Sequence, residues 1–336
     1  MKARVSAERI RSPWMVVPVA TVALVLLSIG LGHDYQLKHE DNNAMHATFA
    51  RNHHAAGLAI TKAHDAYINP KNDRVSFYAH HPPGCGLLLA GVFAVAGSDR
   101  PAVVRSTAVA STLLALVALW WMVRREAGPL TALLAATFFA VVPQAAFYGR
   151  MVNHEVLALP AIVILVDRYF ATARGGGWKS AAALIAAAGA GALFGWVTFF
   201  AIAACAAHAL LSLRRPEIYP AAGRALALLG ASGAVLFAAD LLHIAWVRGG
   251  DLSDLSAIFS ARVGAGRSYG ALEWAYKMFG FSHRLTTFSG TLAVLWLAIR
   301  SLRGLAGRVR LQPVEEMAAV FLAASTGYLV LSLIHI

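Results

Sequence analysis

Two groups of acidic and basic residues lie beside apolar segments, where they could carry out chemistry at a membrane surface. Glu40 and Asp41 follow the first apolar run, and Arg150 and Glu155 lie in a short polar turn between two later runs. A carboxylate can take a proton from a hydroxyl or an amine, and an arginine can hold a phosphate through charge-assisted hydrogen bonds. We therefore expect acids and cations from separate turns to converge on one cleft.

Histidines are concentrated in the same polar segment as the first acids. On one helix, His39, His46 and His53 would recur about 10.5 Å apart at 1.5 Å per residue, which is too far for a single ion to bridge. We therefore expect the histidines to contact a substrate or to face the membrane interface, with a bound divalent metal ion as the alternative. Eight of the thirteen lie in this segment, namely His33, His39, His46, His53, His54, His64, His80 and His81.

The polar candidates also have purely structural explanations. Glu40 and Asp41 could cap a helix over residues 42–54, and Arg150 could form an interfacial ion pair with Glu155. Aromatic and basic residues in a later polar segment could contact an anionic ligand, or they could anchor the chain at the membrane interface. These residues are Arg262, Arg267, Trp274 and Tyr276.

The composition places these residues in a membrane protein. Of 336 residues, 58% are hydrophobic and 14% are charged, with a mean hydropathy of +0.60, whereas soluble domains carry about 25% charge. The net charge of +12 comes from basic residues scattered between apolar runs, a pattern typical of membrane topology rather than of a nucleic-acid partner. Two cysteines, Cys85 and Cys205, support neither a disulfide framework nor a cysteine-based metal site.

About nine membrane-spanning helices are expected. One crossing needs about 20 apolar residues, and residues 180–213 are long enough for a hairpin of two helices that turns at Gly195-Trp196. Lysine and arginine residues between the runs fit a cytoplasmic N-terminus. We therefore expect an all-α polytopic protein of a bacterial inner membrane. The other runs lie near 13–32, 102–123, 129–147, 156–172, 223–246, 286–300 and 316–334.

Two polar segments fall outside the membrane on this topology, a large loop over 33–83 with juxtamembrane helices and a later loop over 248–284. Residues 84–97 are too short to cross and should form a juxtamembrane helix at the outer interface. A crossing there would invert every later loop and break the arginine pattern. The whole chain, 1–336, is expected to form one domain, and its end inside or just after an apolar run suggests a truncated C-terminal region.

These motifs resemble the GT-C superfamily of glycosyltransferases, in particular its dolichyl-phosphate-mannose-protein mannosyltransferase and ArnT-like branch (glycosyltransferase families 39 and 83). The resemblance covers about residues 14–215. In one departure, the family's usual first acid falls on Asn42 when counted back from Ala50-Arg51, one residue after Asp41. The shared features are an acidic motif after the first helix, Ala50-Arg51 followed by Gly57, His81-Pro82-Pro83, Gly97 with Ala102 and Arg105, and a second acid in the next outward turn.

The resemblance implies a GT-C-like bundle and an inverting glycosyltransferase. Such an enzyme moves a sugar from a polyprenyl-phosphate donor to an extracytoplasmic lipid, glycan or protein, and it requires no certain cofactor. Asp41 is the favoured general base, and Glu40 and Glu155 are the other acidic candidates. The cations that could hold the phosphate are Arg51, His80, His81, Arg105 and Arg150, of which His81 and Arg150 are the first choices.

A membrane transporter or flippase of lipid-linked or small anionic substrates is the alternative function. Such a protein should carry charges inside its spans and break its helices in matched halves. Here only Asp167 and Asp240 are acids within spans, and the other acids gather in polar segments. A structural or assembly protein is the third hypothesis. The clustering of the acids favours the enzyme.

Overall fold

The computed structural model describes residues 13–35, 40–69, 71–72, 74–253, 256–257, 273, 276, 292–304 and 311–333. Within these ranges every element of regular secondary structure is a helix except for one antiparallel hairpin, so the predicted all-α class is confirmed. The hairpin joins β1 (Ala66–Ile68) to β2 (Val75–Phe77), with Tyr67 opposite Ser76. The helices are η1 (Pro13–Met15), α2 (Val16–Ser28), α3 (Asp41–Ala56), α4 (Gly84–Ala96), α5 (Pro101–Ala127), α6 (Pro129–Val141), α7 (Pro143–Tyr148), α8 (His154–Ala173), α9 (Trp178–Phe194), α10 (Val197–Ser212), α11 (Ala222–Val247) and α14 (Pro313–Leu333).

The lengths of the helices identify a multi-pass membrane protein. Helices α5, α8 and α11 are long and apolar enough to cross a membrane, and five further apolar helices in the described ranges have 10–17 residues. The expected run near 129–147 divides into α6 and α7, because Pro143 lacks the N–H that would continue the first helix. The expected total of about nine spans stays a prediction.

The expected hairpin over 180–213 is present as α9 and α10, which meet at Gly195 and Trp196. A Cβ atom at position 195 would lie 3.0 Å from the Cβ of His154. The glycine therefore lets this turn approach the first residue of α8 closely, and that approach brings α9 and α10 beside the candidate site.

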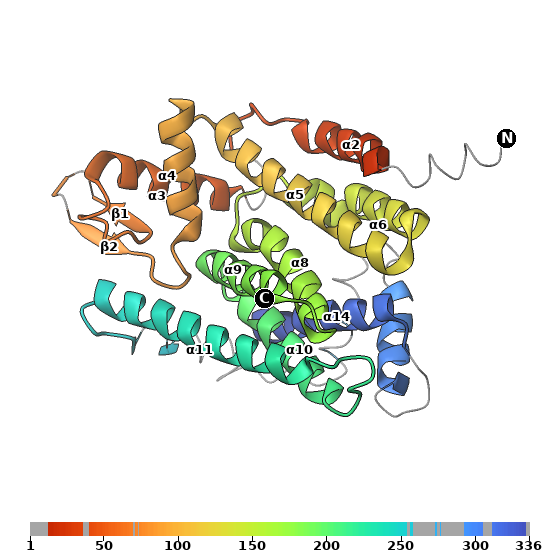
Figure 1. The fold of residues 1–336 in the computed structure, drawn as a ribbon. Coiled ribbons are helices and arrows are strands. Elements are labelled where there is room, and N and C mark those ends of the chain that lie inside the picture. The colour runs from red at the N-terminus through yellow and green to blue at the C-terminus, as the bar shows by residue number, and fades with distance from the viewer. Residues whose placement is uncertain are drawn as a thin grey trace.

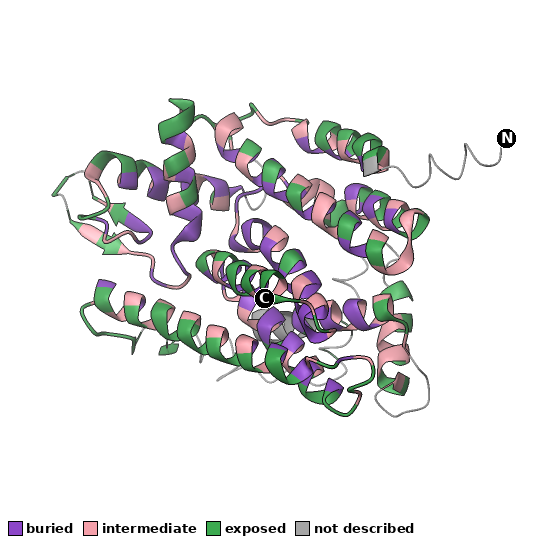
Figure 2. Ribbon diagram, viewed as in Figure 1, coloured by how far each residue is buried: buried purple, intermediate pink, exposed green. Residues whose placement is uncertain are grey.

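Helix α8 is the centre of the bundle and packs against α5, α9, α10 and α11 (Figure 1). Two thirds (67%) of its most apolar stretch is buried, against 17% for α11. Figure 2 shows the same contrast, with buried residues along α8 and exposed faces on α2 and α11. The exposed apolar faces are those that a bilayer would cover.

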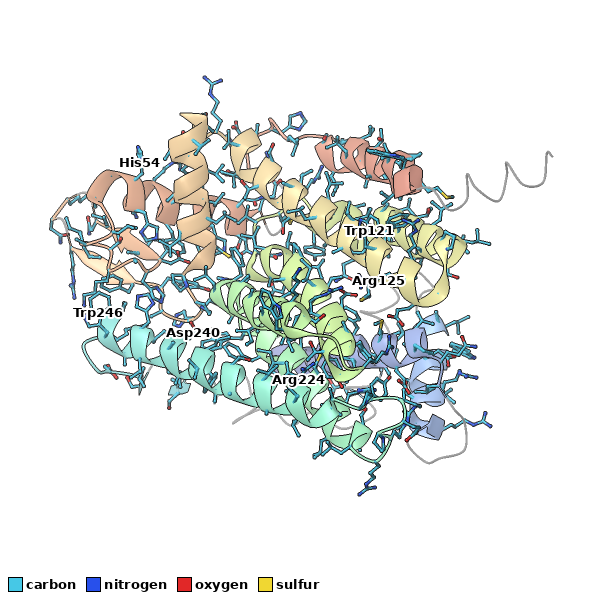
Figure 3. The ribbon with its side chains drawn as sticks, viewed as in Figure 1. His54, Trp121, Arg125, Arg224, Asp240 and Trp246 are labelled. Atoms are coloured by element: carbon cyan, nitrogen blue, oxygen red, sulfur yellow. The ribbon has the colours of Figure 1, made fainter. Side chains whose placement is uncertain are left out.

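The first polar segment forms a lobe at one end of the bundle, made of α3 and the β-hairpin (Figure 1). Its loop reaches the last residues of α11, where Lys62 Nζ donates hydrogen bonds to the carbonyls of Trp246 (3.3 Å) and Val247 (3.1 Å). Figure 3 shows Trp246 below the hairpin. The end of α11 and the lobe therefore lie at the same end of the bundle.

Ion pairs of arginine join the helices at the opposite end. There the last residues of α5, α8 and α10 and the first turn of α14 come together. Figure 3 shows Arg125 and Arg224 well away from His54 and Trp246. The pairs are Arg125–Asp167, Arg174–Glu126 at 2.8 Å and Arg215–Glu316 at 2.6 Å. Asp167 is one of the two acids in the predicted spans. It forms ion pairs with Arg125 and Arg168, and these pairs explain an acid at this position without a role in transport.

The later loop over 248–284 lies mostly outside the described residues. Arg262, Arg267 and Trp274 are among those not described, and Tyr276 is described as 79% exposed. The functional reading of this loop therefore stays a prediction.

Two glycines of α4 provide a test of its packing. A Cβ at Gly84 would lie 2.4 Å from the backbone carbonyl oxygen of Leu193, whereas a Cβ at Gly91 meets nothing within 4 Å. We expect Gly84→Ala to destabilise the protein by about 1–3 kcal/mol through overpacking. Gly91→Ala should be neutral or stabilise it by about 0.5–1 kcal/mol, since alanine favours helix. Thermal unfolding in detergent would compare the two variants, and equal midpoints would contradict the packing of α4 on α9.

Candidate active site

The buried side chain of Arg105 fixes the segment before α3. Arg105 lies in the first turns of α5 and is 1% exposed. Its guanidinium donates to the carbonyls of Leu31 (2.7 Å), His33 and Asp34 (3.3 Å), and to Glu40 Oε1 (2.8 Å). A buried arginine must be satisfied in this way, because an unpaired buried charge is strongly destabilising.

The contacts of Arg105 give the two acids at the start of α3 different environments. Glu40 is the residue before the helix and is 3% exposed, so its carboxylate is committed to Arg105. Asp41 is the first residue of α3 and is exposed. Glu40 makes no side-chain cap on the helix, so its structural role is the ion pair with Arg105 rather than the expected capping. Of the two acids, Asp41 is the one accessible to a substrate.

A hydrogen bond joins the first polar segment to the second outward turn. Asn43 Oδ1, in the first turn of α3, accepts from the backbone N–H of Val152 at 2.6 Å. Arg150, in the same turn, donates to the carbonyl of Ile29 at the end of α2. Glu155, in the first turn of α8, follows three residues after Val152 and is half-buried. The two acidic turns are therefore in contact at the lobe end of the bundle, and the predicted convergence of their acids and cations on one cleft stays a prediction.

The residues before Pro82 pack against the start of α8. The ring of His81 stacks on that of His154, with centroids 4.0 Å apart and planes 14° apart. Trp196, at the turn between α9 and α10, donates from Nε1 to the carbonyl of His80 at 2.7 Å. The motif around His80 and His81 is thus held against His154, the first residue of α8, whereas Arg51 lies toward the other end of α3 and pairs with Asp99.

A cluster of buried histidine, cysteine and aspartate residues lies under this surface. His46 and His53 of α3 approach the carboxylate of Asp65 at 3.9 and 3.8 Å, and Cys85 Sγ lies 3.3 Å from His154 Nδ1. Burial lowers the pKa of His46 well below its usual value. Burial also raises the pKa of the Asp65 carboxyl and of the Cys85 thiol. Burial therefore favours the neutral forms of the His46 imidazole, the Asp65 carboxyl and the Cys85 thiol.

An apolar groove begins beside the site. It has a volume of about 1030 Å³ and is formed by α4, α5, α8 and α9. Leu88 of α4 and Leu157 of α8 line it, and they lie three residues after Cys85 and His154. Phe194 also lines the groove, and its carbonyl oxygen accepts a hydrogen bond from His154. The groove and the polar site therefore share three helices.

The sequence analysis gave no functional role to several residues at this site, and it judged that Cys85 supports no cysteine-based metal site. Asn43, Asp65, Cys85, His154 and Trp196 make the contacts that assemble it. His154 directly precedes the predicted acid Glu155, which was the one local signal for its position. The others are far apart in the sequence, and no spacing rule connects them. His39 lies outside the described residues.

Comparison with known proteins supports the resemblance noted in the sequence. Residues 80–238 match the family profile described as dolichyl-phosphate-mannose-protein mannosyltransferase. The fold matches ArnT from Cupriavidus metallidurans in its apo state (TM-score 0.55) and bound to undecaprenyl phosphate (TM-score 0.59), each at 15% identity. These matches cover 94% of this chain and 58–59% of ArnT, so the chain spans less than two thirds of that protein's length. None of the curated proteins matches the sequence. The predicted resemblance to the GT-C superfamily is confirmed.

Two arginine–carboxylate pairs of this region differ in burial and allow a direct test. Arg105 and Glu40 are 1% and 3% exposed, whereas the side chains of Arg51 and Asp99 are 46% and 51% exposed. We expect Arg105→Gln to destabilise the protein by about 3–5 kcal/mol because it leaves a buried carboxylate unpaired. Arg51→Gln should cost less than about 1 kcal/mol. Thermal unfolding in detergent measures both, and a similar loss in the two variants would contradict the anchoring role of Arg105.

Proposed function

We propose that this chain, with its GT-C fold and its mannosyltransferase-family segment, is an inverting glycosyltransferase that moves a sugar from a polyprenyl-phosphate-linked donor to an extracytoplasmic acceptor. The match of residues 80–238 to the family profile is the observation that carries the reaction class. ArnT, which shares the fold, has been solved with undecaprenyl phosphate bound. The acceptor would be a lipid, a glycan or a protein.

Asp41 is the proposed general base. Its exposure in the first turn of α3 supports this choice, as does the commitment of the neighbouring Glu40 to Arg105. A general base must reach the proton that it removes, and a carboxylate held in a buried ion pair cannot do so. Glu155 is the second acid of the site and is proposed to help to position the acceptor.

The phosphate of the donor would be bound by Arg150 and His81, with His80 beside them. Arg150 lies in the turn that is joined to α3 through Asn43, and His81 is held by its stack on His154. Arg51 and Arg105, which the resemblance also suggested, have carboxylate partners already, Asp99 and Glu40. We therefore rank Arg150 and His81 first.

The apolar groove would receive the polyprenyl chain of the donor. Its volume of about 1030 Å³ and its lining by α4, α5, α8 and α9 suit an isoprenoid tail. Because helices α4 and α8 carry residues of both the groove and the site, a tail in the groove would bring its phosphate toward the polar site. The remaining length of the lipid would lie in the bilayer.

The reaction follows from these positions. Asp41 takes the proton from the acceptor hydroxyl or amine as that group attacks the anomeric carbon. The bond between this carbon and the phosphate oxygen breaks, and the electron pair leaves with the polyprenyl phosphate. Arg150 and His81 stabilise the charge that develops on this leaving group. Attack opposite to the leaving group inverts the configuration of the sugar.

The proposed orientation places the lobe outside the cytoplasm of a bacterial inner membrane. The ends of the helices opposite the lobe carry Arg124, Arg125, Arg174, Arg214 and Arg215. An excess of lysine and arginine at one end favours the cytoplasmic side. The donor and the acceptor would then meet on the outer side, and about nine spans and a cytoplasmic N-terminus would follow.

A transfer assay with radiolabelled sugar on polyprenyl phosphate tests the proposal in membranes that carry the chain. We expect Asp41→Asn to lower the transfer rate by about 10²–10⁴-fold, which is the usual contribution of a general base. Glu155→Gln should lower the rate less. Asp251→Asn, at an exposed carboxylate just beyond α11, is the matched control and should transfer as the wild type does.

Three outcomes separate the hypotheses. Loss of transfer in Asp41→Asn, with normal insertion in the membrane, supports both the enzyme and its base. Unchanged transfer in that variant would exclude Asp41 as the base and would leave Glu155 as the acid to test next, because Glu40 is held in its ion pair with Arg105. If no donor supports transfer by intact wild-type protein, the alternative of a transporter or flippase is preferred.

A further inference from the structure

The buried cluster beneath the site is assigned no step in the proposed transfer reaction. It contains His46, Cys85 and His154, whose potential ligand atoms all lie within 4.8 Å of one another. All three residues are buried, with exposures of 1%, 0% and 7%. Polar atoms enclosed in this way are normally hydrogen-bonded. Several of them here have no such partner among the described residues.

The tautomer of His154 leaves one nitrogen with a lone pair. Its Nδ1 lies 2.6 Å from the carbonyl oxygen of Phe194. A carbonyl only accepts, so Nδ1 carries the proton. Nε2 is then unprotonated, and it is buried without a hydrogen-bond partner in the described structure. Histidines that ligate metal ions commonly donate their other N–H to a backbone carbonyl in this way.

Asp65 presents a second unsatisfied group. Both of its carboxylate oxygens are buried without hydrogen-bond partners among the described residues. The nearest imidazole nitrogens belong to His46 at 3.9 Å and His53 at 3.8 Å, which is too far for a hydrogen bond. His53 is oriented separately, since its Nδ1 bonds the hydroxyl of Thr61 at 2.8 Å. Ionising a buried carboxyl group without hydrogen-bond donors is costly, and a bound cation would offset that cost.

We propose that His46, Cys85, His154 and Asp65 bind one divalent transition-metal ion, for which Zn²⁺ fits the donor set best. Two imidazoles, one thiolate and one carboxylate are all common zinc ligands. Ligand atoms of a tetrahedral zinc site lie about 3.5 Å apart, given bonds of about 2.0–2.3 Å. The ligand atoms of His46, Cys85 and His154 lie within 4.8 Å of one another, and Asp65 Oδ2 lies 3.9 Å from His46 Nδ1, so these side chains would have to move closer together around an ion. Binding would release the thiol proton of Cys85.

The ion would hold together three helices and a loop. His46 belongs to α3, Cys85 to α4 and His154 to α8, while Asp65 lies just before β1. Tying these segments together would fix His154, and through the stack it would fix His81. The role proposed for the ion is structural, so it goes beyond the transfer reaction and does not depend on it. The sequence analysis considered only His39, His46 and His53 as ligands on one helix. Spacing along one helix does not reveal ligands that come from four separate segments.

Metal content of the purified full chain tests the site directly. The protein is isolated in detergent through a tag without histidines, stripped with a chelator, and reloaded with Zn²⁺ or Co²⁺. We expect about one ion per chain, as a four-ligand site would bind. The Co²⁺ form should show the near-ultraviolet absorption of a thiolate–cobalt bond. Loading with Zn²⁺ should also raise the unfolding temperature, because the ion binds the folded chain.

Matched variants assign the ligands. Cys85→Ser should lose the thiolate–cobalt band, and Cys85→Ser and His46→Gln should each weaken metal binding more than about tenfold. The controls are Cys205→Ser, at a buried cysteine of α10, and His54→Gln, at an exposed histidine of α3 that points outward (Figure 3). Both controls should bind as the wild type does.

Cys205→Ser also keeps the test valid if Cys85→Ser misfolds. It removes the other cysteine of the chain, leaves Cys85 in place and does not alter the cluster. A thiolate–cobalt band in this variant assigns the ligand to Cys85. Folded wild-type protein that takes up no stoichiometric Co²⁺, or a band that persists in Cys85→Ser, would overturn the proposal. Metal content is read without sugar transfer, so its failure and the failure of the proposed transferase are separate results.

Discussion

The burial of Arg105 is the constraint on which the candidate site depends. A guanidinium that is 1% exposed within an apolar bundle must find acceptors, and it finds them in three carbonyls of the segment after α2 and in Glu40. These four contacts bring the end of α2 against α5 and determine where α3 begins. Asp41 therefore reaches the surface at a fixed place. The position of this exposed acid thus depends on a cation that is itself buried.

The two ends of the bundle use arginine differently. At the lobe end, Arg105 is enclosed and organises a loop through its backbone. At the opposite end, Arg125 and Arg174 join neighbouring helices through Asp167 and Glu126. These side chains are partly exposed, which limits their contribution to stability. The proposed orientation draws on the same arginines, since positive charge at one end favours the cytoplasmic side. The lobe end combines buried or paired arginines with acids and histidines and lies beside the apolar groove.

Much of the helical framework could be predicted from the sequence, whereas the assembly of the site could not. Apolar runs identified α5, α8 and α11, and the Gly195-Trp196 turn was visible because two helices cannot share one run of that length. The length of a run did not reveal the break before Pro143. The β-hairpin and the cluster of Asp65, Cys85 and His154 escaped notice because their contacts join distant segments. Local spacing rules detect ligands that lie on one helix, whereas α3 supplies only one of the four proposed metal ligands.

Helix α3 is held at several points along its length, and these contacts fix the position of Asp41. Glu40 fixes the entry to the helix, Asn43 fixes its first turn to Val152, and His46 and His53 face Asp65 farther along. A helix anchored on one face in this way cannot rotate without breaking several buried contacts. Its first turn also presents free backbone N–H groups that favour a nearby negative charge. Asp41 is therefore held in a fixed direction at a helix end that suits a carboxylate, and positioning of this kind is what a general base requires.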